Sequence, residues 1–160
     1  MPQARAMLRK PLILLGRRPL INYDGSMTVA GKKANLSHVY AYAVPGFFDK
    51  TKDDTVVLLT DRELAPAQIR DSFGLNKLAE QGKLCFVQET INAAGQIVNF
   101  TLGHASFKFP PSGGSTEHVF ESRLEKASAS GTVSTKGEQI TFGIAYEYSA
   151  NLTAPIAAKK

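Results

Sequence analysis

The chain has 160 residues, of which 43% are hydrophobic and 21% are charged, and this composition excludes a wholly disordered protein. Its length corresponds to one domain that buries a core without disulfide bonds or structural metals. The one cysteine, Cys85, has no partner for an internal disulfide. Its apolar surroundings, KLCFVQ, predict a small residue of a buried strand and not a nucleophile.

The net charge of +5 is concentrated at the N-terminus. Residues 1–33 carry seven basic side chains and one acidic one, so the rest of the chain sums to about −1. Residues 1–24 are therefore interpreted as a basic arm, a remnant export signal or a disordered tail. The longest apolar run, residues 12–15, is too short to cross a membrane, and no small-residue cleavage site follows it.

This N-terminal segment supplies the candidate partner-binding residues. We expect the arm to dock on another protein or a protein assembly, with an anionic membrane surface or the phosphates of a nucleic acid as alternatives. Sequence-specific nucleic-acid binding is not predicted, because the domain that follows is nearly neutral. The basic side chains concerned are Arg5, Arg9, Lys10, Arg17 and Arg18.

Residues 25–156 are predicted to form a single β-rich domain, followed by a tail at residues 157–160. Residues 26–30 and 34–44 have the pattern of a hairpin that turns at Gly31 and Lys32. Residues 55–60, TVVLLT, are apolar on both faces and predict an interior strand.

One helix is predicted at residues 66–81. Pro66 suits a first helical position and Gly82 suits a helix stop. An apolar stripe along the segment predicts that this helix packs on a sheet. The stripe consists of Ile69, Phe73, Leu75, Leu78 and Ala79.

The second half of the domain consists of strands and turns. Residues 83–90 and 96–103 predict another hairpin, and residues 104–116 predict a long loop. Residues 138–148 show the clearest alternation of apolar and small or polar side chains. The whole pattern predicts an antiparallel β-sandwich or flattened barrel of about eight strands with one helix.

No phosphate-loop, dinucleotide-binding, nucleophile-elbow, zinc-protease or calcium-loop motif occurs in the chain. The leading interpretation is therefore a non-enzymatic protein-interaction or structural module without a cofactor. It would dock on a larger assembly or cell-envelope partner through its arm, its 104–116 loop and its strand edges.

Two other interpretations stay open. The first is a carrier of a small apolar ligand, whose barrel interior is lined by Phe100, Phe120, Phe142 and Tyr146. The second is a metal-dependent enzyme. His104 and His118 flank the long loop, and Glu117 lies beside His118, which gives two histidines and one carboxylate.

Three stretches of the chain carry a resemblance. They are GSMTVAGKKANLSHVYAYAVPGFFDKTKDDTVVLLTDREL, FGLNKLAEQGKL and ITFGIAYEYSANLTAPI. Together they resemble uncharacterised exported bacterial β-rich domain proteins over most of residues 25–156. The resemblance implies a sandwich-like fold and a periplasmic or cell-surface location, and it transfers no site residues.

Overall fold

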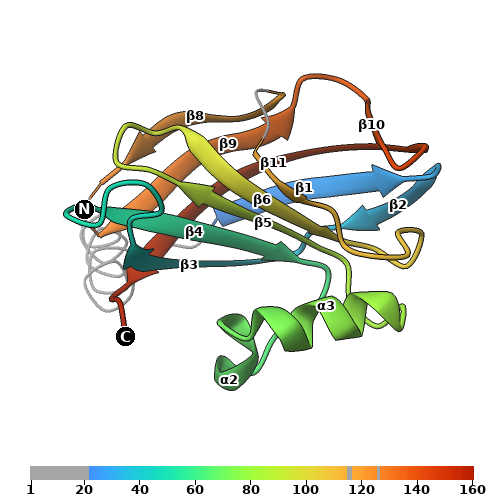
Figure 1. The fold of residues 1–160 in the computed structure, drawn as a ribbon, viewed down its shortest axis with the longest axis horizontal. Coiled ribbons are helices and arrows are strands. Elements are labelled where there is room, and N and C mark those ends of the chain that lie inside the picture. Colours follow the sequence, from blue (N-terminus) through green and yellow to red (C-terminus); the bar gives the residue numbers. More distant parts are fainter. Residues whose placement is uncertain (1–21, 115–116, 126) are drawn as a thin grey trace, which may run out of the picture.

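A computed structural model describes residues 22–114, 117–125 and 127–160, and it shows a curled, mainly β structure (Figure 1). The β-rich prediction is therefore confirmed. Residues 1–21 of the predicted arm, with its five basic residues, lie outside the described residues, whereas residues 22–24 belong to the first strand. The strands are β1 (Asn22–Val29), β2 (Lys32–Asn35), β3 (His38–Pro45), β4 (Asp53–Thr60), β5 (Phe86–Ile91), β6 (Ile97–Gly103), β7 (Ser112–Gly113), β8 (His118–Leu124), β9 (Ser128–Thr135), β10 (Gln139–Thr141) and β11 (Ile144–Ala157).

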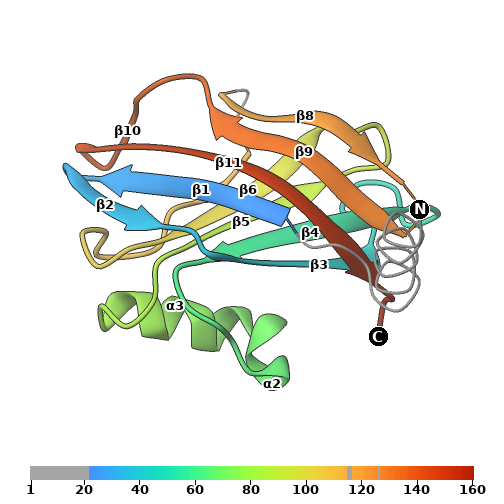
Figure 2. The ribbon, with the colours of Figure 1, turned by 180° about the vertical axis from the view of Figure 1, so that it is seen from behind.

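The strands form one mixed sheet that curls into a half-barrel, so the prediction of a purely antiparallel architecture is wrong. Strand β11 pairs antiparallel with β1 on one side and with β9 on the other. Its last residues then pair in parallel with β3, where Ile156 lies opposite Ala41. This parallel contact joins the group β1, β2, β8–β11 to the group β3–β7 (Figure 2).

Alternation along β11 directs one set of its side chains into the half-barrel. Glu147, Ser149 and Asn151 are exposed, whereas their neighbours point inward and are buried. The inward residues join a core contributed by both groups of strands. From β11 they are Tyr146, Tyr148, Ala150, Leu152 and Ala154.

Two helices replace the single helix predicted at residues 66–81. They are α2 (Pro66–Ile69) and α3 (Ser72–Glu80), and the break has a local cause: the Asp71 carboxylate caps α3 by accepting a hydrogen bond from the Gly74 amide. Figure 1 shows both helices on the outer side of the sheet, where Leu75 and Ala79 pack on β4 and β5. Phe73, predicted to be buried, is 80% exposed.

Two predicted strands are interrupted by turns. Phe142 and Gly143 both have positive φ, which is the geometry of a two-residue hairpin turn, so residues 138–148 form β10, a turn and the start of β11. The first hairpin likewise turns at Ala30 and Gly31, not at Lys32, and its predicted second limb is divided into β2 and β3. These breaks and the short β7 explain why the described residues form more than eight strands.

The half-barrel remains open along one seam. Strand β8 pairs with β9, and β6 pairs with β5 and β7, but no strand pairing joins β6 to β8 in the part of the chain that the structure describes. None of the described helices is long and apolar enough to cross a membrane.

A glycine at the end of β6 sets how closely the helix approaches the sheet. A Cβ atom at Gly103 would overlap the buried ring of Phe86 and would lie 2.9 Å from the Cβ of Ala79 on α3. We expect Gly103→Ala to lower the free energy of unfolding by about 1–3 kcal/mol, because the interior is already filled. Urea unfolding measures this, with Gly114→Ala as the control, since its nearest non-neighbouring atom is 3.8 Å away. Equal stability of the two variants would contradict this packing.

Candidate functional site

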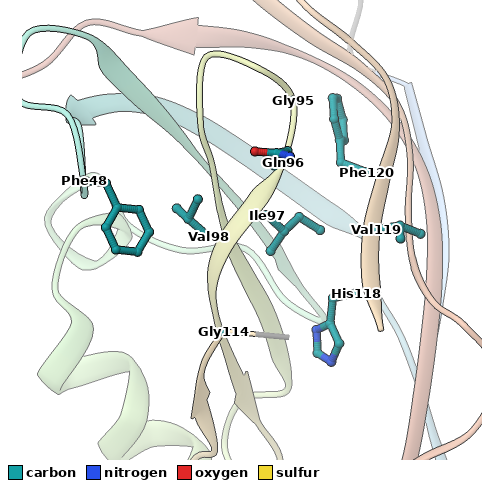
Figure 3. A pocket seen from close by; sticks show the side chains of 9 residues that line it. All are labelled: Phe48, Gly95, Gln96, Ile97, Val98, Gly114, His118, Val119 and Phe120. Carbon is teal, nitrogen blue, oxygen red and sulfur yellow. The ribbon is translucent and has the colours of Figure 1, made fainter. Parts of the chain in front are cut away.

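A cleft of about 860 Å³ occupies the open seam. One wall comes from β6 and the turn before it, and the other comes from the start of β8. Figure 3 shows Ile97 between the two strands and Phe48 beside Val98. The lining residues are Phe48, Gly95, Gln96, Ile97, Val98, Gly114, His118, Val119 and Phe120.

His118 connects this cleft to a chain of buried hydrogen bonds. Its Nε2 atom lies 2.8 Å from the hydroxyl of Tyr146, and its Nδ1 atom lies 2.9 Å from the hydroxyl of Tyr148. The Tyr148 hydroxyl is in turn hydrogen-bonded to Oε1 of Glu89. We call these four residues the polar chain. All four side chains are buried, so the polar chain crosses the interior from β8 to β11 and on to β5.

Strand alternation explains why these side chains meet. Glu89 lies two residues from both Val87 and Ile91, which are core residues, so its side chain points to the same inner face. Tyr146 and Tyr148 likewise share the inward phase of β11. The curl of the sheet then brings β5 opposite β11 across the interior.

Burial controls the charge state of Glu89. It raises the pKa of this carboxyl to about 8, although the hydrogen bond with Tyr148 acts in the opposite direction. The second oxygen, Oε2, is buried and has no hydrogen-bond partner among the residues that the structure describes. A buried carboxylate with only one such bond would be costly, which is why the neutral acid prevails at neutral pH.

Burial also keeps the other members of the polar chain uncharged. It lowers the pKa of His118 to about 4 and raises the pKa of both tyrosines, with Glu89 adding to the effect on Tyr148. The ring of Phe100 covers that of His118, with 4.1 Å between ring centroids. At neutral pH the polar chain is therefore a set of four neutral groups that exchange hydrogen bonds.

The residues of the predicted metal site do not come together as one. In the described ranges no group of three His, Cys, Asp or Glu side chains is placed to hold a metal ion. His104 is buried, and its Nδ1 accepts a hydrogen bond from the Ser106 amide at 3.0 Å. His118 directs both ring nitrogens at tyrosine hydroxyls.

Three of the four residues predicted to line a barrel interior lie in the core of the half-barrel. Phe100, Phe120 and Tyr146 belong to the core, and Phe120 also lines the cleft. Phe142 is 77% exposed, because it occupies the turn between β10 and β11 and not a strand.

Sequence reasoning missed Glu89 and the role of Tyr148. The sequence FVQETI did indicate an inward position for Glu89. In a strand this glutamate lies on the same face as Val87 and Ile91, which are apolar. Its partner lies 59 residues away, and nothing in the sequence indicates that pairing.

Comparisons of the chain with protein-family models, curated proteins and solved structures found no match. The resemblance to exported β-rich proteins therefore stays a prediction.

Glu89 is expected to make the folded protein less stable as the pH rises. Its pKa is about 8 in the fold, against an ordinary value of 4.5 in an unfolded chain. Between these values the folded state holds the extra proton, so the free energy of unfolding falls with pH, on the order of 1 kcal/mol per pH unit. Above pH 8 the carboxyl is ionised in both states and the decline ends.

The titration of His118 has the opposite effect on the free energy of unfolding, and it does so at lower pH. Its folded pKa of about 4 lies below the ordinary 6.5, so the unfolded chain holds the extra proton between these values and stability falls as the pH falls. Between pH 4.5 and 6.5 the effects of Glu89 and His118 oppose each other, and only Glu89 acts from 6.5 to 8.

We therefore predict that the free energy of unfolding declines between about pH 6.5 and 8 and that Glu89→Gln removes this decline. Urea unfolding at several pH values measures it. Glu147→Gln, which changes an exposed carboxylate of β11, is the matched control and should behave as wild type. A wild-type stability that stays constant over this interval would contradict the protonated Glu89.

Proposed function

We propose that the protein binds a small, largely apolar molecule in the cleft between β6 and β8. The observation that carries this proposal is an open cleft of about 860 Å³ that reaches a buried polar cluster through His118. Ligand pockets typically have this size and combine apolar walls with a few placed polar groups. The cleft lies where the described residues of β6 and β8 do not pair, and it opens there to solvent.

His118, the member of the polar chain that lines the cleft, is poorly suited to act as a general base. A general base works best with a pKa near the operating pH, and burial has moved His118 to about 4. Both of its ring nitrogens are also engaged by tyrosines. The Cys85 thiol is a poor nucleophile for a similar reason, since burial and then the nearby Asp61 raise its pKa to about 11.

Filling the cleft should abolish ligand binding without unfolding the protein. Val98 is partly exposed and lines the cleft, so Val98→Trp places a large ring in the ligand's space. We expect the affinity for phenylnaphthylamine, a neutral fluorescent probe of apolar sites, to fall at least about tenfold. Fluorescence titration measures it.

The control for this experiment is Ile140→Trp, which adds the same ring at a position that is 72% exposed and outside the cleft. Its affinity should match that of the wild type. A probe that binds Val98→Trp as tightly as the wild type would refute the assigned site.

A second candidate function is the protein-binding role predicted from the sequence. Exposed phenylalanines favour it, since apolar side chains in contact with water mark interaction surfaces when they cluster. Phe47 and Phe48 form such a pair, with ring centroids 4.8 Å apart. A native protein partner that binds Val98→Trp as tightly as the wild type would support this second function, because the cleft is filled in that variant.

A further inference from the structure

We propose that a groove beside α2, on the outer side of the sheet, binds an amphipathic carboxylate such as a fatty acid, and that Arg70 pairs with its carboxylate group. The inference goes beyond the proposed function, because this groove is separate from the cleft between β6 and β8. Three observations carry it. They are an apolar stretch on the outer face of β11, the groove that this stretch lines, and the surroundings of Arg70.

The outer face of β11 changes from polar to apolar towards the end of the strand. Its exposed outward residues are polar as far as Asn151, whereas the same phase of the strand then presents Pro155 and Ala157. Ala157 lies opposite Tyr42, where β11 joins β3. Apolar residues on a face that is otherwise polar indicate a surface that contacts another molecule.

This apolar stretch lines a groove of about 390 Å³. β3 and the end of β11 form its floor, and α2 and the residue that follows it, Arg70, form one wall. Pro66 and Ile69 are the residues that α2 contributes, and both are apolar. The volume lies within the usual range of ligand pockets, and the apolar floor and wall suit a hydrocarbon chain.

Arg70 is held in place at this groove by two contacts. Its guanidinium carbon lies 4.4 Å from the centroid of the Tyr42 ring, and its Nη2 atom donates a hydrogen bond to the Ala158 carbonyl at 2.7 Å. An arginine that is already stacked and bonded loses little further freedom when a ligand binds. No ion pair joins Arg70 to a carboxylate in the described part of the chain.

The charges at the groove favour an anion. Its described lining contains two basic side chains, Arg70 and Lys160, and no acidic one. A guanidinium can donate two parallel hydrogen bonds to a carboxylate, and such charge-assisted bonds are stronger than neutral ones. An incoming carboxylate would therefore give Arg70 the partner that the described residues do not provide.

Apolar walls and an unpaired guanidinium together select an amphipathic carboxylate. A small anion would leave the apolar floor in contact with water, and a neutral apolar molecule would leave Arg70 without a carboxylate. The cleft between β6 and β8 differs, since its described lining contains no lysine, arginine or acidic side chain. The two sites are thus expected to differ in the charge of the ligands that they bind.

The experiment titrates the full-length protein with two fluorescent probes that differ only in their head groups. cis-Parinaric acid is a fatty acid, and parinaryl alcohol has the same chain with a neutral hydroxyl group. We expect the acid to bind at least about tenfold more tightly than the alcohol at about pH 7.5, which is the effect of one charge-assisted pair. Equal affinities of the wild type for the two probes would contradict recognition of the carboxylate.

Variants of Arg70 test the residue assigned to the carboxylate. Arg70→Gln removes the charge, so the acid should lose its advantage over the alcohol. Arg70→Lys keeps the charge without the planar fork and should recover only part of that advantage. Arg62→Gln is the matched control and should bind both probes as the wild type does, because Arg62 lies outside the groove and pairs with Asp61.

Two tryptophan variants distinguish the groove from the cleft. Ala157→Trp places a large ring in the groove and should weaken the acid at least about tenfold. Val98→Trp, which fills the cleft, should leave the affinity for the acid unchanged. Circular dichroism verifies that each variant is folded. Should Arg70→Gln fail to fold, the two tryptophan variants and the comparison of acid with alcohol still decide.

The outcomes separate this inference from the proposed function. Acid binding that is lost in Val98→Trp but unchanged in Ala157→Trp would place the fatty acid in the cleft, which would overturn the inference and leave the proposed function standing. A wild type that binds phenylnaphthylamine but not the acid would have the same meaning. If the acid binds as expected and phenylnaphthylamine does not bind, the groove stands and the proposed function is wrong.

Discussion

The hydrogen bond between Glu89 and Tyr148 is the contact on which the interior of the half-barrel depends. It joins β5 to β11 across a core that is otherwise mainly apolar. A carboxyl group at this depth must be neutral or well paired, and here one oxygen is bonded to a single hydroxyl while the other has no partner within the described part of the chain. The proton that Glu89 retains is therefore part of the folded structure, and the neutral histidine and tyrosines follow from the same burial.

Because of the open seam, one member of the polar chain, His118, lines a cleft. Had β6 paired with β8, the sheet would have closed and the His118 ring would have been sealed inside, as in a fully closed barrel. The seam instead leaves a cleft with His118 on its wall. His118 thereby links the wall of this cleft, where we propose that a ligand binds, to the buried neutral groups of the polar chain.

The sequence was sufficient to predict the β-rich class, the interior strand now seen as β4 and the hairpin of β5 and β6, because each follows from local alternation and turn residues. The sequence did not predict the places where one residue interrupts a strand or a helix. Phe142 adopts positive φ and breaks an alternating run, and the Asp71 cap divides a helix. The site itself depends on Glu89 and Tyr148, whose contact is a product of sheet curvature and not of spacing.

The most direct test of this account is the protonation state of the Glu89 carboxyl, observed by infrared difference spectroscopy between about pH 6 and 9.5 on the wild type and on Glu89→Gln. The account predicts a protonated carboxylic acid at the lower pH, with a C=O band that is lost as the pH rises through about 8 and that is absent from Glu89→Gln. A wild-type spectrum in which every carboxyl is already ionised at about pH 6 would contradict it.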